Sequence, residues 1–267
     1  MATPTSILSV HKNIGDLKIK KILVSQPKPE NDKSPYNDLA EKHKLTIDFR
    51  PFIEVKGIPA RDFRQAKVNI LDHTAVIFTS RTAIDHFFRI AEEMRITIPD
   101  DMKYFCISEA TAFYLQKYIV YRKRKISYGN GKFDDLLKLI VKNNKETFLI
   151  PLSDIHKADI PAKLKKNKIK FTKAILYRTV AADLSDLSDV NYDILVFFSP
   201  SGIASLFENF PDFKQNDTKI AAFGPSTSKA VDDAGLTLNI KAPQPKAPSM
   251  TMALDHFIKD FNKNGSK

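Results

Sequence analysis

Residues 194–235, ILVFFSPSGIASLFENFPDFKQNDTKIAAFGPSTSKAVDDAG, contain the pattern that predicts the fold. An apolar run at 194–198 stops at a Ser-Pro-Ser-Gly turn, and apolar residues at helical spacing follow it up to Phe210. The same features return with an apolar run at 220–223, the turn Gly-Pro-Ser-Thr-Ser and a second helical pattern that ends before Gly235. A strand that is apolar on both faces is typical of a parallel sheet covered by helices. The stretch therefore predicts two consecutive strand–turn–helix units of an α/β fold.

Small hydroxyl residues fill both of these turns. In parallel sheets, ligands bind outside the carboxyl ends of the strands. The free N–H groups at a helix start also attract anions. We therefore expect a binding edge for a negatively charged ligand, formed by Ser199, Ser201, Ser226, Thr227 and Ser228.

Composition sets limits on the class of protein. The chain has 267 residues, of which 43% are hydrophobic, so one large domain or two small ones are expected. No apolar run approaches the roughly 18 residues of a membrane span, and residues 1–17 read as a flexible leader. The net charge of +11 favours an acidic partner but does not choose among nucleic acid, lipid and a polycarboxylate. Cys106 is the only cysteine, which indicates a cytoplasmic protein without an internal disulfide.

The rest of the chain also alternates between strand and helix patterns. A helix is expected to start near Ser34, which can cap it. Another is expected at 155–164, and strands are predicted at 22–24, 75–78, 104–107, within 118–126, and at 147–150, where Pro151 would end the strand. Segments 45–55 and 169–180 differ because apolar and polar residues alternate in them, which is typical of a strand with one covered face.

The two halves of the chain resemble each other at an offset of roughly 120 residues, the size of one small domain. The simplest arrangement is α/β, with two repeated domains, each a parallel sheet flanked by helices, joined by a two-stranded antiparallel β-ladder. Domain A would contain residues 18–50 plus 179–267, and domain B residues 51–178. The linker strands would lie at about 45–55 and 169–180. Clefts between domains are common ligand sites, so we expect the turns to face a shared cleft.

Four short motifs in order resemble the uroporphyrinogen-III synthase family: FTSRTA at 78–83, LYRT at 176–179, FSPSG at 198–202 and FGPSTSKA at 223–230. The resemblance covers the chain from about residue 18 to the last helix. It implies the two-domain fold and a cofactor-free reaction on hydroxymethylbilane, a linear tetrapyrrole polycarboxylate. Such enzymes expel water, invert ring D through a spirocyclic intermediate and close the macrocycle to uroporphyrinogen III. The resemblance also implies that neither a metal nor an organic cofactor takes part.

The resemblance also implies site residues, at the positions of this sequence that match the family's motifs. Tyr177 would assist departure of the hydroxyl by hydrogen bonding, or would simply pack at the domain joint. Arg81 and Arg178 could meet substrate carboxylates or remain surface residues. The hydroxyl residues could instead be ordinary helix caps, each of which stabilises by about 1 kcal/mol. The expected substrate-binding set is Thr79, Ser80, Arg81, Thr111, Ser199, Ser201, Thr227 and Ser228.

The chain departs from the family pattern at two turns. Many members carry Arg-Pro where this chain has Gln26-Pro27, so one expected cation is missing, and Lys28 is a candidate replacement. Many carry Gly where this chain has Ser108-Glu109. The Glu109 carboxylate would repel an acidic substrate.

Two other classes of function remain as alternatives. A non-enzymatic two-lobed α/β module that binds an anionic ligand would share the architecture. A nucleic-acid binder would use the basic run at 122–125, although that run also suits a solvated surface, and no aromatic platform accompanies it. The six histidines are scattered and form no metal-spaced cluster. We therefore expect a cytoplasmic monomer that binds a small molecule and no metal, nucleic acid or membrane.

Overall fold

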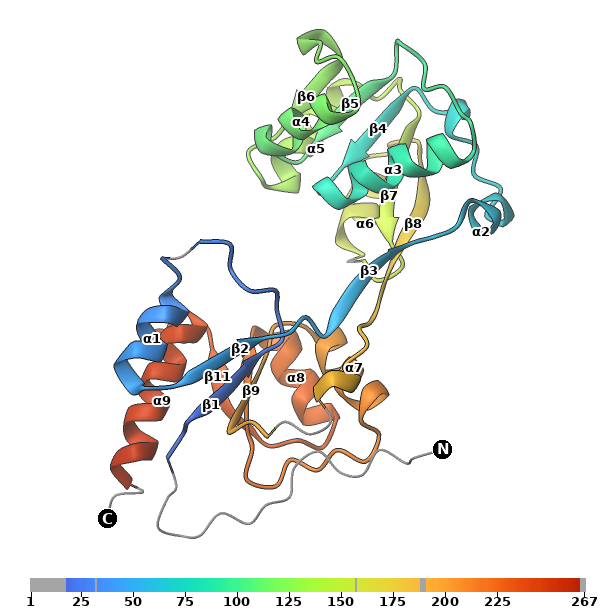
Figure 1. The fold of residues 1–267 in the computed structure, drawn as a ribbon. Coiled ribbons are helices and arrows are strands. Elements are labelled where there is room, and N and C mark those ends of the chain that lie inside the picture. The colour runs from blue at the N-terminus through green and yellow to red at the C-terminus, as the bar shows by residue number, and fades with distance from the viewer. Residues whose placement is uncertain (1–17, 32, 157, 188–190, 265–267) are drawn as a thin grey trace. The chain divides into compact units, whose positions relative to one another are not determined.

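The computed structural model describes residues 18–31, 33–156, 158–187 and 191–264, so the expected leader at 1–17 lies outside the described residues. The chain forms two compact units (Figure 1). Unit 1 contains the described residues up to Glu54 and those from Val180 onward, and unit 2 is Val55–Thr179. No helix in the described ranges is long and apolar enough to cross a membrane.

Unit 1 is built on a five-stranded parallel sheet with the order β11-β10-β9-β1-β2. Its strands are β1 (Lys21–Val24), β2 (Thr46–Phe49), β9 (Ile194–Phe197), β10 (Lys219–Phe223) and β11 (Leu238–Ala242). Helices α1 (Pro35–His43) and α9 (Met250–Asn264) pack together over one face, and α7 (Pro200–Asn209) and α8 (Pro225–Asp233) over the other (Figure 1). Ser34 caps α1 and Pro35 is its first residue, as predicted.

Unit 2 contains a six-stranded sheet with the order β3-β8-β7-β4-β5-β6. Its strands are β3 (Ile53–Gly57), β4 (Ala75–Phe78), β5 (Lys103–Cys106), β6 (Ile126–Tyr128), β7 (Phe148–Ser153) and β8 (Phe171–Ala181). Apart from β3, the paired strands run parallel. The main helices are α3 (Arg81–Glu93) and α4 (Glu109–Tyr114) on one face, and α5 (Phe133–Lys142) and α6 (Asp159–Lys166) on the other. The short α2 (Ala60–Gln65) and the 3₁₀ turns η1 (Ile70–Asp72), η2 (Leu115–Lys117) and η3 (Lys123–Lys125) connect them, and η4 (Ser185–Leu187) lies in unit 1.

The two sheets repeat one plan. The pair β1–β2 corresponds to β7–β8, and β9, β10 and β11 correspond to β4, β5 and β6. Strand β9 and its counterpart β4 are buried along their whole length, as the apolar runs predicted. The predicted fold class is therefore confirmed, with a different chain order in each half.

The chain passes between the units in β3 and again in β8, and these strands pair. Ile58 N–H donates to the Leu176 carbonyl and Ala182 N–H to the Phe52 carbonyl, both at 2.9 Å, so the pair is antiparallel. The segment 45–55 is not one strand: its first part is β2 in the parallel sheet of unit 1, and its end begins β3. Arg50 and Pro51 separate the two, because proline has no N–H to continue the ladder.

Strand β7 differs from prediction because it continues through Pro151 to Ser153. Its neighbour β4 pairs only with Phe148 and Leu149. Beyond that point β7 pairs on one side alone, with β8. A proline is tolerated there because its missing N–H leaves no ladder bond unmade.

Candidate functional site

Ser80 and Ser199 occupy equivalent turns at the carboxyl ends of the central strands β4 and β9. The Ser80 hydroxyl accepts from the Ala83 N–H at 3.1 Å and the Ser199 hydroxyl from the Gly202 N–H at 3.2 Å, so each caps its helix. Both turns lie where the strand order reverses, which is where open α/β sheets bind ligands. Thr79 and Ser201 flank these caps and are half-buried.

The next turns of the two units, after β5 and β10, are built differently. Ser108 caps α4, and its hydroxyl lies 3.0 Å from that of Thr111. Gly224 has φ +88° and starts α8 with no side-chain cap. Thr111, Thr227 and Ser228 are all buried, and the Ser228 hydroxyl donates to the Gly224 carbonyl at 3.0 Å. These three predicted residues therefore lie inside the packing of their helices, whereas Ser226 is exposed.

Arg81 and Glu109 are the first residues of α3 and α4 in unit 2. The Tyr128 hydroxyl donates to Glu109 Oε1 at 3.0 Å, which holds the carboxylate at the turn. The exposed Arg81 guanidinium lies 5.4 Å from the Tyr114 ring centre, a cation–π contact. In unit 2 the helices after β4 and β5 thus begin with a cation and a carboxylate. In unit 1 the corresponding helices, after β9 and β10, each begin with a proline.

Tyr177 lies on β8, and its ring stacks on His86 of α3 with ring centres 5.0 Å apart. Burial raises the pKa of Tyr177, and a hydrogen bond with the Ser80 side chain offsets part of that rise. The Ser80 hydroxyl oxygen accepts from the Ala83 N–H, so its O–H remains available as a donor.

His86 is in turn held by Arg89, three residues along α3. Arg89 Nε donates to His86 Nδ1 at 3.1 Å, and its Nη2 donates to the carbonyls of Ile58 and Leu176 at 2.9 and 3.2 Å. A Cβ at Gly57 would lie 2.7 Å from this guanidinium. Burial and the Arg89 charge lower the pKa of His86, so the imidazole is neutral at pH 7, with its proton on Nε2.

Sequence reasoning missed His86, Arg89 and Gly57. They belong to no short motif, and only the fold brings α3, β3 and β8 together. The spacing of His86 and Arg89, one helical turn apart, was the sole signal that could have indicated them.

Asp154 is a further unpredicted residue beside Tyr177. Its Oδ1 accepts from the Ser153 hydroxyl at 2.9 Å, the Ile155 N–H at 2.8 Å and the Thr179 N–H at 3.2 Å. Burial raises its pKa, but these hydrogen bonds and the Arg178 charge outweigh burial and hold the pKa below the usual range. The carboxylate ties the turn after β7 to β8, while the Arg178 side chain is exposed.

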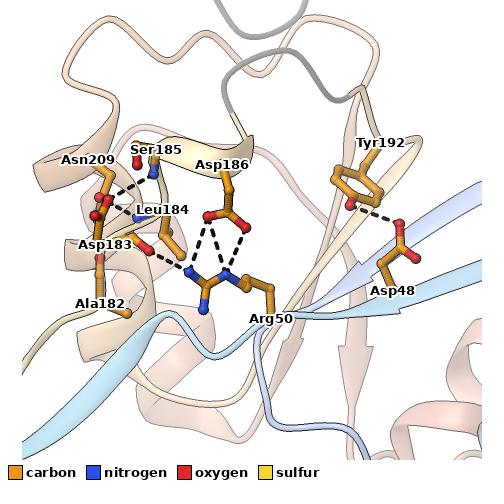
Figure 2. Close-up of polar contacts among 9 residues, drawn as sticks. All are labelled: Asp48, Arg50, Ala182, Asp183, Leu184, Ser185, Asp186, Tyr192 and Asn209. Atoms are coloured by element: carbon orange, nitrogen blue, oxygen red, sulfur yellow. Dashed lines mark hydrogen bonds and ion pairs between the residues drawn. The ribbon is translucent and has the colours of Figure 1, made fainter.

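In unit 1, Arg50 directly follows β2, and its side chain binds the segment that follows β8 (Figure 2). Its Nε and Nη2 each lie 3.1 Å from an Asp186 carboxylate oxygen, and Nη2 donates to the Asp183 carbonyl at 2.7 Å. Asn209 at the end of α7 accepts from the Leu184 N–H and donates to the Ala182 carbonyl, as Figure 2 shows. The segment 182–186 is thus held within unit 1 by the side chains of Arg50 and Asn209.

Within the described ranges, no group of three His, Cys, Asp or Glu side chains is placed to hold a metal ion. At the first turn of unit 1, Gln26 stands in place of the family's cation and Lys28 is exposed.

Comparisons with known proteins give one family. The family model described as "Uroporphyrinogen-III synthase HemD" matches residues 34–252. A uroporphyrinogen-III synthase from Chlorobaculum parvum is 24% identical over 260 residues, which cover 90% of this chain and all of that protein. One from Saccharomyces cerevisiae is 26% identical over 149 residues, 48% of this chain and about half (54%) of that protein's length. A solved structure of the Helicobacter pylori uroporphyrinogen-III synthetase has a TM-score of 0.56 at 17% identity, covering 90% of this chain and 99% of that one, which is a likeness of fold.

Proposed function

The chain belongs to the uroporphyrinogen-III synthase family, and from that premise we propose which of its residues carry out the reaction. Its activity is that of a uroporphyrinogen-III synthase, a hydro-lyase of tetrapyrrole biosynthesis that acts on hydroxymethylbilane. The observation that carries the assignment is the family match over residues 34–252, which include the helix-start turns of both units.

The reaction asks for positioning more than for strong acids or nucleophiles. The electron-rich pyrrole can expel the hydroxyl of hydroxymethylbilane, and unguided closure gives the isomer without ring inversion. Holding ring D so that its other position attacks is therefore the main task of the protein. We assign the grip on the substrate carboxylates to the helix starts of α3 and α7, whose N–H groups and partial positive charge favour anions.

Tyr177 is our candidate for assisting departure of the hydroxyl. Its phenol is protonated at neutral pH, and burial raises its pKa further above the usual value. If Ser80 donates to the phenol oxygen, the Tyr177 O–H is left to hydrogen-bond the leaving hydroxyl and give it a proton, so that it departs as water. The proton released when the macrocycle closes then restores the phenol. His86 and Arg89 support this role by fixing the plane of the ring.

The remaining predicted contacts divide by accessibility. Ser80, Ser199, Thr79, Ser201 and Arg81 are at least partly exposed and are proposed to touch the substrate. For the buried Thr111, Thr227 and Ser228 we propose that they shape the turns from within.

The proposal is tested by giving the purified protein freshly made hydroxymethylbilane, oxidising the products and separating the isomers. Isomer III is expected, and isomer I alone would refute the assignment. Tyr177→Phe should lower turnover about tenfold or more, since a hydrogen bond to a developing charge is lost. Tyr192→Phe is the matched control, because it removes another hydroxyl that bonds a side chain, Asp48 at 2.9 Å, before β9 begins (Figure 2). Equal activity of both variants would leave Tyr177 a packing residue.

We further propose that the protein acts as a cytoplasmic monomer that binds neither nucleic acid nor membrane. The buried single Cys106 supports the location, because it offers no disulfide. Sedimentation velocity would test the monomeric state, and salt-dependent binding to DNA and RNA would test the lack of nucleic-acid binding.

A further inference from the structure

Unit 2 contains a hollow of about 360 Å³ that lies away from the turns after β4. It is lined by the middle of α3, by the loop before β5 and by the segment before β6. Because β5 and β6 begin there, the hollow lies at the amino ends of these strands, whereas ligands of open α/β sheets occupy the carboxyl ends. The volume is at the lower end of the usual range for ligand pockets, about 300–1,000 Å³.

The walls of the hollow are aromatic and held in place. Phe88 and Tyr118 stack with ring centres 4.5 Å apart and planes 6° from parallel. The Tyr118 hydroxyl donates to Asp85, which also accepts from Tyr114 and Lys117. This carboxylate fixes the wall before any ligand arrives, which lowers the entropic cost of binding.

A buried hydroxyl opens into the hollow. Tyr104 is only 3% exposed, and its hydroxyl has no hydrogen-bond partner among the described residues. Among the described residues, every fully enclosed side-chain oxygen or nitrogen has a hydrogen-bond partner. The unpartnered Tyr104 hydroxyl is therefore not fully enclosed, and the small area that Tyr104 exposes includes this hydroxyl. Burial, with Asp100 and Cys106, raises the pKa of Tyr104 to about 12, so the group is a donor at neutral pH.

The mouth of the hollow is mainly cationic. Arg122 and Lys125, part of the basic run at 122–125, both line it, and neither forms an ion pair with another described residue. Asp100 is the one carboxylate in the lining. Two cations and a neutral donor favour an anionic group, and Asp100 can accept from an N–H of the same ligand.

We propose that this hollow is a second binding site, for a flat aromatic group of one ring or two fused rings that bears a carboxylate. The aromatic group would lie among Phe88, Tyr118 and Ile98, and the carboxylate would meet Tyr104, Arg122 and Lys125. The site is too small for a linear tetrapyrrole, so it is separate from the synthase reaction. The proposal rests on unit 2 alone and stands whether or not the proposed roles of Tyr177 and Ser80 hold.

Indole-3-acetate is a suitable probe because it has a flat ring, a carboxylate and a ring N–H. Added to the ¹⁵N-labelled full chain, it should shift the amide signals of Asp100, Val120 and Arg122, with a dissociation constant on the order of 1 mM. Indole-3-acetamide, which is neutral, and cyclohexylacetate, which is not aromatic, should each bind several-fold more weakly.

Two variants test the named groups. Tyr104→Phe should weaken indole-3-acetate about threefold or more, and the double change Arg122→Gln with Lys125→Gln about tenfold. The control, Lys165→Gln with Lys166→Gln on α6, removes the same charge away from the hollow and should leave binding unchanged. All three should keep synthase activity.

Several results would overturn the proposal. These are equal binding of the acid and the amide, shifts confined to other parts of the chain, no shift up to about 10 mM, or equal weakening by the Arg122/Lys125 and control pairs. Arg122 is exposed and Lys125 is partly exposed, so the double change gives a test that does not depend on how well Tyr104→Phe folds.

Discussion

The two units share a strand order but not the contents of their carboxyl edges. Both place a serine cap after the central strand, Ser80 in one and Ser199 in the other. Among the described residues, unit 2 adds a tyrosine that stacks on a histidine, and that histidine accepts a hydrogen bond from an arginine. Helix capping alone explains the serines that both edges share. The side chains found at one edge are therefore better candidates for a role in the reaction.

The difference has a simple origin in strand length. Strand β8 has 11 residues, whereas its counterpart β2 has four. The extra length of β8 pairs with β3 and lets the strand continue beyond Tyr177, which is the last residue of the parallel ladder and lies opposite Ser153 of β7. Unit 1 has no equivalent extension, since β2 ends at Phe49 and Arg50 instead binds Asp186.

The largest loss of stability is expected from a substitution that creates a cavity in the core of one unit and leaves the core of the other unit intact. Phe78 and Phe197 are equivalent, fully buried residues, and their hydrophobic clusters each stay within one unit. Phe78→Ala and Phe197→Ala should each cost about 3–5 kcal/mol of the stability of their own unit, because a cavity replaces the ring. Amide hydrogen exchange should show lost protection in the altered unit alone. Loss of protection in both units would break the comparison, because it would make the chain one cooperative body.

The second effect tests why the turns after β5 and β10 differ. Gly224 has φ +88°, and a Cβ there would meet no atom within 4 Å, so any cost of Gly224→Ala comes from the backbone alone. We expect about 1–3 kcal/mol, measured by urea unfolding. Ser108→Gly at the equivalent position, where φ is −147°, should cost only a few tenths of a kcal/mol. Similar costs at both sites would show that the left-handed backbone at Gly224 is not required.

Much of this fold could be predicted because its signals are local. The apolar runs of β4 and β9, the caps at Ser34, Ser80 and Ser199, and the repeat all follow from short-range patterns. The extent of β7 through Pro151 could not be predicted, because tolerance of a proline depends on how far β4 pairs alongside. The support of Tyr177 by His86 and Arg89 could not be predicted either, since it depends on three elements that only the fold brings together.

Asp255 lies on α9, in the α1–α9 layer of unit 1. Burial raises the pKa of Asp255, but hydrogen bonds from Lys259, His43 and Lys42 outweigh it and lower the pKa well below its usual value. A lowered folded-state pKa stabilises above the unfolded-state value of about 4, and this stability is lost as pH falls through the folded-state value. Asp255→Asn should therefore cost about 1–3 kcal/mol at pH 7 and progressively less below about pH 4.

Asp260→Asn on the same helix is the control, since Asp260 is exposed. Thermal unfolding of both variants between about pH 3 and pH 7 measures the difference. A cost for Asp255→Asn that does not shrink in acid would show that shape, not charge, sets its contribution.

The smallest stability effect is also the one that separates capping from chemistry. Ser80→Ala and Ser199→Ala each remove one cap and should each cost about 1 kcal/mol. If both hydroxyls only cap, the two variants will keep equal turnover at temperatures where both are folded. If Ser80 also donates to Tyr177, Ser80→Ala will lower the turnover number, because it removes a hydrogen bond to the phenol, while Ser199→Ala changes mainly KM. Ser80→Thr keeps the hydroxyl and should restore turnover. If the loss in Ser80→Ala were purely structural, Ser80→Thr and Ser80→Ala would have the same turnover number. A matched loss of turnover in both alanine variants would mean that the two edges, despite their different side chains, contribute alike.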